Sequence, residues 1–532
     1  MTQYRSRITV LLVLVLSAFL VHTVTTAEGQ ITGQTTQDIT HLRLASSKPI
    51  ASLDPADDDA DPALVTQLFA GLTEIDPETF KPKPSLAHSW EVSEDGTVYT
   101  FFLRKDIRWS NGKPITSHDF VATLRKHLEV FEPSKDLLLL KNVQSLLDGE
   151  LEDESLLGFQ AVDNHILQFT LEHPAPLFPV IVSFLHYRPV PVQVIEEKEK
   201  AWTHPKNIVV SGPYTLQRWR KQKVLILIKN PMYFDAEKVQ IAQISYIMLP
   251  SSQFALKMYK ENALDIIPVS KRGQIAAISD MLGIREPLSE KPLLETWYLG
   301  FNQSRPPVDQ PLVRKAIAMA IDKDFLLKKI LRLMGHASNT FTAPPSFGAV
   351  NSKAEIGIPF NPEQGQQQLF EAGYENKKLP KIYISGPADV VLKPLKLMLE
   401  RNLPIKVGLY GEDEEAGTPE DAHIFLSFKQ AVYPDAYYFL SEFSSASSME
   451  KLHWNNENYK KYTELINKAF RQRDLKQRKE LYQKAEYILC QDEVAVIPLF
   501  YREIAFLATP RLQWTYSPTG TQQLWTWSFT AK

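Results

Sequence analysis

Hydrophobic and polar residues follow two periods along this chain, one typical of strands and the other of helices. Strands are predicted where short β-branched and aromatic runs are bounded by turn formers, and helices where apolar residues recur every three or four positions. Because the two kinds of element are interleaved, the pattern predicts an α/β fold. The predicted strands are His41–Ala45, Thr97–Leu103, Val224–Ile228 and Ile244–Met248, and the predicted helices are Val121–Val130, Val313–Leu333, Tyr459–Phe470 and Arg478–Leu489.

The first 27 residues have the order of a secretory signal sequence. Arg5 and Arg7 form a basic start, an apolar run follows over residues 8–21, and small residues end at Ala27. The apolar run is shorter than the roughly 20 residues that a membrane-spanning helix needs. We therefore expect export and cleavage after Ala27, with an uncleaved membrane anchor as the alternative.

The charge balance narrows the class of partner. The 532 residues include 59 Lys and Arg against 62 Asp and Glu, a formal net charge of −3. Removal of residues 1–27 leaves 57 basic and 62 acidic residues, a net charge of −5. Nucleic acid binding requires clustered Lys and Arg to neutralise phosphates. A mildly acidic chain therefore argues against a nucleic acid partner.

The chain has one cysteine, Cys490, so no disulfide can form within it. No cysteine lies near the expected cleavage site, which excludes lipid attachment to an N-terminal cysteine. We expect a soluble, lipid-free periplasmic protein that is stabilised by the size of its core. Cys490 follows the helical pattern of Leu481–Leu489 and is expected to be a core residue.

No motif for covalent chemistry is found in the sequence. It has no phosphate-binding loop, no paired-histidine zinc motif and no nucleophile-elbow pentapeptide. An acidic run over residues 54–61 is similar to a calcium loop, but Pro62 replaces the glycine of the sharp turn and Leu68 the closing glutamate. We therefore expect no metal and no cofactor. A catalytic triad assembled from distant residues stays open.

A series of short motifs, in order over nearly the whole chain, resembles one protein family. The longest is LAHSWEVSEDGTVYTFFLRKDIRW followed by SNGKPITSHDFVATL, over residues 86–124. Others are SLDPA (52–56), SGPYTL (211–216), ALDI (263–266), FNQSRPPVDQPLVRKAIAMAID (301–322), APP (343–345), EAGY (371–374), YPD (433–435) and AVIPLF (495–500). The chain resembles the bacterial extracellular solute-binding proteins of the peptide and nickel ABC-transporter family, family 5. WTHPKNIVVSGPYTLQRW, at residues 202–219, is similar to its oligopeptide-binding branch.

This resemblance implies an α/β protein with the two-lobed, type II fold of periplasmic binding proteins and one additional domain. Such a protein has three structural domains in total, and its sheets are mixed. The lobes of such a protein close around a ligand by a hinge motion. Residues 28–73, 206–290 and 503–532 would form a discontinuous first lobe, 74–205 the additional second domain, and 291–502 the third domain, which forms the opposing lobe.

The resemblance also implies how a peptide is held between the lobes. Two strands would pair with the main chain that all peptides share. Asp435, in the sequence YPDAYY, matches the family aspartate that binds the N-terminal amine, because a desolvated ammonium is costly without a partner. The alternative is that Asp435 is an ordinary turn residue after Pro434. The two implied strands consist of Asp59, Ala60 and Asp61, and of Ala431, Val432 and Tyr433.

Several positions depart from the oligopeptide-binding pattern. Lys429 stands where an arginine is usual, and it keeps the charge but loses the planar guanidinium. Val432 stands where an aromatic residue is common, and residues 134–143 lack the expected tyrosines. Peptide length and side-chain preference therefore stay open, as does peptide itself. The acidic residues 57–61 would either favour basic ligands or form a solvated loop.

Other family-pattern residues lie away from the implied strands. Trp297, Tyr298 and Arg502 are near the expected hinge and are candidates for the lining of the cleft, although a Trp on a strand is more often a core residue. Arg314 and Asp322 are expected to be scaffold residues, with Asp322 capping the helical turn that follows it.

The leading hypothesis is a substrate-binding component of an ABC importer that captures short peptides and delivers them to a membrane permease and its ATPase. A monomer without catalytic residues is expected. A separate ATPase would explain why no phosphate-binding loop is found. The alternatives keep the fold and change the solute to a nickel chelate, haem or a murein peptide, or replace binding by peptide hydrolysis.

Overall fold

The computed structural model describes most of the chain after residue 39. The expected signal sequence at residues 1–27 lies outside this part, as does Asp58. Within the described part, every helix is too short or too polar to cross a lipid bilayer. The described residues are 40–46, 49–57, 59–129, 135–271, 290–350, 356–374, 379–411, 421–445 and 451–530, and the single residues 274, 278 and 288.

The predicted strands are confirmed, with their ends shifted by a single residue at most. They are β1 (His41–Ser46), β5 (Val98–Leu103), β9 (Val224–Lys229) and β10 (Gln243–Met248). β5 forms a hairpin with β4 (Ala87–Val92), and the turn contains Gly96 at a φ of 77°. Glycine adopts this left-handed conformation without strain, which explains the turn.

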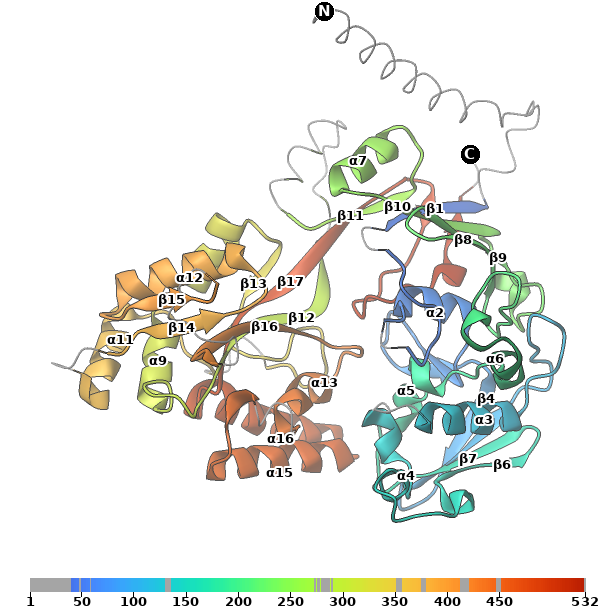
Figure 1. The fold of residues 1–532 in the computed structure, drawn as a ribbon, viewed down its shortest axis with the longest axis horizontal. Coiled ribbons are helices and arrows are strands. Elements are labelled where there is room, and N and C mark those ends of the chain that lie inside the picture. Colours follow the sequence, from blue (N-terminus) through green and yellow to red (C-terminus); the bar gives the residue numbers. More distant parts are fainter. Residues whose placement is uncertain are drawn as a thin grey trace, which may run out of the picture.

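The largest sheet joins strands from distant parts of the sequence. Ten strands form its main path and an eleventh, β13 (Gly335–Ala337), pairs with β17 (Val496–Ala508) beside that path. Figure 1 shows one end of the sheet in each of two lobes. The order is β15 (Val407–Leu409), β14 (Ile382–Ser385), β16 (Ile424–Gln430), β12 (Glu290–Phe301), β17, β11 (Ile266–Val269), β1, β10, β9 and β8 (Tyr214–Arg220).

Strand β17 belongs to both lobes. Its C-terminal part pairs with β11 in the first lobe, and its longer N-terminal part pairs with β12 in the opposing lobe. Ala505 is the point of transition, because it lies opposite Val269 on one side and Glu290 on the other. The red strand that crosses the middle of Figure 1 is β17. The lobes are therefore connected by continuous strand pairing.

A smaller antiparallel sheet lies below α2 (Pro62–Leu68) in Figure 1. Its order is β4, β5, β7 (Ile166–Thr170) and β6 (Phe159–Asp163), and α3 (Ser117–Leu128) packs near β6. Edge-to-face contacts among Phe101, Phe169 and Phe178 fill its core. The N-cap of α3 is Thr116, and Asp119 completes a capping box by accepting the Thr116 N–H at 2.7 Å.

The opposing lobe has a separate hydrophobic core on each face of its sheet. Successive strand residues point to opposite faces, so Leu299 packs in one core while Tyr298 packs in the other. The core around Leu299 includes side chains of α9 (Pro311–Met319) and α12 (Asp389–Asn402). The core around Tyr298 includes the buried Cys490, as expected, and side chains of α13 (Ala436–Leu440), α15 (Glu457–Arg471) and α16 (Leu475–Tyr487).

The prediction of one helix over Val313–Leu333 is wrong. Helix α9 ends at Met319, and a new helical segment begins with α10 (Lys323–Phe325). Asp322 has an extended backbone and its carboxylate accepts the N–H of Phe325 at 2.9 Å, so it caps a new helix as expected. An aspartate bonded to its local backbone favours a helix start over a helix interior.

The buried side chain of Arg314 connects α9 to the segment before β17. It is fully buried and donates to Glu493 Oε2 at 2.8 Å, to the Glu493 carbonyl at 2.7 Å and to the Val308 carbonyl at 2.9 Å. Glu493 is only 5% exposed and also accepts from two asparagine side chains. Arg314 is therefore a structural residue, as the sequence pattern predicts.

Arg314→Met should lower the free energy of unfolding by about 3–5 kcal/mol, because Glu493 stays buried without its cation. Guanidinium unfolding followed by tryptophan fluorescence measures the loss. The matched control is Arg305→Met, since Arg305 pairs with Asp421 at a site where both side chains are more than a third exposed. Its loss should stay below about 1 kcal/mol. Equal losses of unfolding free energy in the two variants would show that the buried Arg314–Glu493 pair stabilises the protein no more than an exposed pair does.

Candidate functional site

A cavity of about 480 Å³ lies between the two lobes. The opposing lobe contributes the last residue of β16 and the two residues after it. The other side contributes the start of α2, segments near the smaller sheet and the C-terminal segment. Small-molecule pockets are often found at such domain interfaces. The lining residues fall within 61–66, 74–75, 136, 183–188, 430–432 and 517–525.

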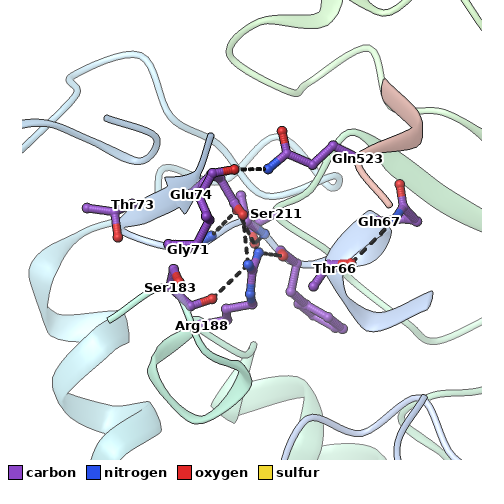
Figure 2. A network of polar contacts seen from close by, with 12 residues as sticks. Thr66, Gln67, Gly71, Thr73, Glu74, Ser183, Arg188, Ser211 and Gln523 are labelled. Carbon is purple, nitrogen blue, oxygen red and sulfur yellow. Dashed lines mark hydrogen bonds and ion pairs between the residues drawn. The ribbon is translucent and has the colours of Figure 1, made fainter. Parts of the chain in front are cut away.

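An ion pair between Glu74 and Arg188 forms one side of the cavity (Figure 2). The guanidinium makes two parallel contacts to the carboxylate, at 2.7 and 2.8 Å. Arg188 also donates to the carbonyls of Phe69 and Ser183, at 2.6 and 2.8 Å. Both charges are buried, so their bidentate pairing is what makes their burial tolerable. The pair fixes the C-terminal end of α2 against the wall segment at residues 183–188.

The C-terminal segment forms a polar wall of the cavity. Gln67 of α2 donates to the Gln522 carbonyl at 2.8 Å, and Gln523 donates to the Ile75 carbonyl at 2.5 Å. Lys83 donates to the side chain of Gln523 at 3.1 Å. These bonds hold residues 517–525 against α2 and against the segment at residues 75–83, so that amide and hydroxyl groups line the cavity.

The main chain of the opposing lobe reaches the cavity where β16 ends. The N–H of Ala431 still donates to the Leu294 carbonyl at 2.8 Å. Val432 follows with a side chain that is 55% exposed, and within the described chain its backbone N–H and carbonyl have no hydrogen-bond partner. Val432, just after the end of β16, therefore lines the cavity with a main-chain N–H and carbonyl that are available for hydrogen bonding.

Two segments that were expected to be strands have other structures. Residues 431–434 are irregular, and Asp59–Asp61 form a turn with a single bridge from Ala60 to Ser52. Pro434 ends the first segment and Pro62 follows the second. Proline has no N–H to donate to a strand ladder, which explains why neither segment forms a strand. Asp61 caps α2 by accepting the Ala63 N–H at 3.0 Å. Of the predicted positions, Asp61, Ala431 and Val432 line the cavity, whereas Asp59 and Ala60 do not.

Asp435 does not line the cavity. Its carboxylate is 1% exposed, forms an ion pair with Arg478 of α16, and accepts the N–H of Tyr437 at 3.0 Å as the cap of α13. Arg478 in turn lies 4.6 Å from the ring centre of Phe347. The predicted contact of Asp435 with a ligand amine stays a prediction.

The remaining candidates from the sequence contact partners within the chain. Lys429 pairs with Glu442 at 2.7 Å, and Arg502 lies 3.8 Å from Glu295. Trp297 stacks between Phe428 and Phe500, with ring centres 5.3 and 5.9 Å away. Tyr298 is buried in the core described above. None of these four side chains lines the cavity, and their roles toward a ligand also stay predictions.

The two lobes touch at several points around the cavity. Tyr433 donates its hydroxyl to the Phe80 carbonyl at 2.5 Å, and Arg473 donates to the Glu94 carbonyl at 2.9 Å. The ring of Phe184, a cavity residue, meets Tyr438 edge-on at 5.7 Å. The two sides of the cavity are therefore in contact in the described conformation. Tyr433 makes one of these contacts and does not line the cavity.

Several cavity residues carried no signal in the sequence. Asp136, Arg188 and the segment at residues 517–525 belong to no short motif, and the fold alone brings them together. The polar run SPTGTQQ at residues 517–523 is the only local hint, because such a run is unusual for a buried C-terminal wall. In the described residues, no cluster of three His, Cys, Asp or Glu side chains has the arrangement of a metal site.

Two lobes that share a sheet and enclose a cavity define the class of extracytoplasmic solute-binding proteins. The sequence profile of the bacterial extracellular solute-binding proteins, family 5 (middle region), matches residues 81–451. This match covers more than half of the chain, and the chain belongs to that family. The family assignment from the sequence motifs is confirmed.

Individual relatives agree with the family in sequence and in fold. The periplasmic oligopeptide-binding protein OppA of Escherichia coli is 27% identical over 535 residues, which cover 96% of this chain and 95% of OppA. The probable deoxycholate-binding periplasmic protein YgiS of E. coli is 28% identical over 463 residues, which cover 84% and 85%. An oligopeptide-binding protein of Borrelia burgdorferi superimposes with a TM-score of 0.75 at 27% identity, covering 92% of this chain and all of that one. These relatives are binding proteins, and the predicted two-lobed α/β fold is confirmed.

Asp435→Asn removes the charge that faces Arg478 and keeps an oxygen that can accept the Tyr437 N–H. We expect the free energy of unfolding to fall by about 3–5 kcal/mol, because Arg478 stays buried without a counter-charge. Urea unfolding measures this loss. Asp153→Asn is the control, since Asp153 caps a short exposed helix and asparagine caps equally well. A loss no larger than that of the control would contradict a stabilising role for the Asp435–Arg478 pair.

Proposed function

We propose that this protein is the substrate-binding component of an ABC importer, and that it captures short peptides in the cavity between its lobes for delivery to a membrane permease and its ATPase. The observation that carries this proposal is that Val432, in the cavity wall of a family 5 protein, has a backbone N–H and carbonyl without hydrogen-bond partners in the described chain. Relatives that are named for oligopeptide binding support it.

An open main-chain segment suits a ligand that is itself a main chain. A peptide that pairs with the N–H and carbonyl of Val432 is recognised without regard to its side chains. The exposed side chain of Val432 then lies next to the ligand and limits what fits there. Polar side chains of residues 517–525, across the cavity, provide further donors and acceptors for ligand amides.

The roles of the predicted site residues divide into two groups. Asp61, Ala431 and Val432 line the cavity, which supports direct contact with the ligand. Asp435 and Lys429 are paired with residues of the same lobe, which supports a role in holding residues 431–434 in place. Trp297, Tyr298 and Arg502, near the shared strands, would stabilise the hinge region.

The proposal includes export and organisation of the chain. Cleavage after Ala27 would release a lipid-free monomer into the periplasm, and the periplasmic names of the relatives support this compartment. Residues 28–73, 206–290 and 503–532 would form the first lobe, 74–205 the second domain and 291–502 the opposing lobe. The shared strand β17 and the separate four-stranded sheet support this division. No catalytic step is part of the proposal.

Titration calorimetry with tri-alanine tests the proposal on the purified mature protein. We expect one peptide bound per chain and, in small-angle scattering, a smaller radius of gyration on binding, because the lobes close around the ligand. Native mass spectrometry of the untreated protein should show a bound peptide. A nickel chelate, haem or murein peptide found there instead would replace oligopeptides as the solute, and hydrolysis of the added peptide would contradict the absence of catalysis.

Tyr433→Phe should weaken peptide binding about fivefold, which corresponds to the roughly 1 kcal/mol of one hydrogen bond lost from the closed state. The lost bond joins the Tyr433 hydroxyl to the Phe80 carbonyl across the lobes. Tyr487→Phe is the matched control, because Tyr487 is 45% exposed and its hydroxyl has no hydrogen-bond partner among the described residues. Calorimetry compares the three proteins. Identical affinities would show that the bond between the lobes does not contribute to the liganded state.

A further inference from the structure

We propose that one face of the opposing lobe binds the surface of a membrane that contains anionic phospholipid. The face is formed by α12 and by α10 with the π-helical segment that continues it, Leu326–Leu331. We call it the basic apolar face, meaning the exposed side chains of residues 324–332 and 389–401. None of these residues lines the cavity, so the inference goes beyond the proposed function and does not depend on it.

The basic apolar face is the outer side of a helical layer. Its two segments pack side by side, and Figure 1 shows α12 near the upper edge of the opposing lobe. Both segments direct other side chains inward, into the core around Leu299. These inward side chains include Leu326, Leu327, Leu331, Val391, Leu395 and Leu399. The side chains that point outward from the two segments therefore share one surface.

Four large apolar side chains of this face are exposed to solvent. Val390 and Leu397 are 68% and 67% exposed, the two highest values for large apolar side chains in the described part of the chain. They are seven positions apart, about two helical turns, and so lie on the same side of α12. Phe325 and Ile330 are also exposed. Single exposed apolar residues are ordinary, but four on two adjacent segments can enter an apolar phase together.

Basic side chains surround these apolar residues. The face has six basic and three acidic side chains, an excess of three positive charges. Two of the acids are already engaged, because Asp324 pairs with Lys328 at 2.5 Å and Glu400 accepts the Val407 N–H at 2.9 Å. The expected mature chain carries a net charge of −5, so the positive excess is local. The six basic residues are Lys328, Lys329, Arg332, Lys393, Lys396 and Arg401.

This combination suits a lipid surface better than a protein partner. Lysine is depleted in protein–protein interfaces, whereas helices that lie on membranes combine Lys or Arg with apolar residues. A lysine can keep its ammonium among the headgroups while its methylene groups, and neighbours such as Leu397, enter the boundary with the acyl chains. Four apolar side chains give only weak attachment, so anionic headgroups must supply the rest of the attraction. The partner is therefore a membrane surface with negative charge.

Vesicle flotation with the purified mature protein, without peptide, tests this inference. One set of vesicles consists of dioleoylphosphatidylcholine, and in the other about 30% of the lipid is dioleoylphosphatidylglycerol, which makes the surface negative. The wild type should bind the anionic vesicles about tenfold or more tightly than the neutral ones. Raising sodium chloride from about 50 mM to about 500 mM should reduce this preference, because salt screens the charges. Equal binding to both sets, or no binding to the anionic vesicles, would overturn the inference.

Charge variants test the basic residues of the face. The double variant Lys329→Gln with Lys393→Gln should bind anionic vesicles about 25-fold more weakly, since each basic residue near such a surface contributes about fivefold. The matched control is Lys476→Gln with Lys479→Gln, because both lysines are exposed on α16. Core side chains of α16 pack on the other face of the sheet. A control that loses as much binding as the double variant would overturn the assignment.

Leu397→Gln tests the apolar part of the face. Its binding to anionic vesicles should be about threefold weaker or more, because less apolar surface enters the membrane. Leu475→Gln is the control, since Leu475 is 61% exposed at the start of α16. Unchanged binding of Leu397→Gln would show that no apolar residue at this position enters the bilayer, and would overturn the inference.

A fluorescent label identifies the face that touches the membrane. Leu397→Cys and Leu475→Cys each offer an exposed thiol to a nitrobenzoxadiazole reagent, whereas the native Cys490 is buried. On anionic vesicles the emission of the label at position 397 should shift to shorter wavelength, because the label leaves water. The label at position 475 should keep its emission. Equal shifts at the two positions, or a shift at position 475 alone, would overturn the assignment to the basic apolar face.

Folding and a protein partner are checked separately. The Tm of each glutamine variant should stay within about 2 °C of that of the wild type, because the replaced side chains are exposed. Weaker binding together with a lower Tm would make these residues structural and overturn the inference. Cytoplasmic-membrane vesicles provide the last comparison. Binding to them that is lost after trypsin treatment would assign the face to an acidic membrane protein, and would also overturn it. The proposed function fails in a different way, when no peptide binds in calorimetry.

Discussion

The pairing of strand β17 with β11 and with β12 is the constraint on which the two-lobed structure depends. Ala505 lies between Val269 and Glu290, so strand pairing along β17 passes from one lobe into the other. Close to this point, the register of β12 against β17 shifts between Pro292 and Thr296. Pro292 has no N–H, which weakens the ladder there. A bend at this point would disturb few hydrogen bonds, which fits the hinge that the family resemblance implies between the lobes.

Three ion pairs of buried side chains connect different parts of the scaffold. Glu74 pairs with Arg188 and Asp435 pairs with Arg478, and the fully buried Arg314 follows the same rule through Glu493. Each pair connects elements that are far apart in the sequence, because an unpaired buried charge would be more costly than the lost freedom of the chain.

Local pattern in the sequence predicted the strands and the cap at Asp322, because both depend on neighbouring residues. It failed for the helix through Val313–Leu333, where an apolar period continued across a capping aspartate that starts a new helix. It also gave no sign that the carboxylate of Asp435 is buried against Arg478, 43 residues further along the chain. Asp136 was not found at all. Its position next to the opposing lobe follows from packing between domains, which no local pattern encodes.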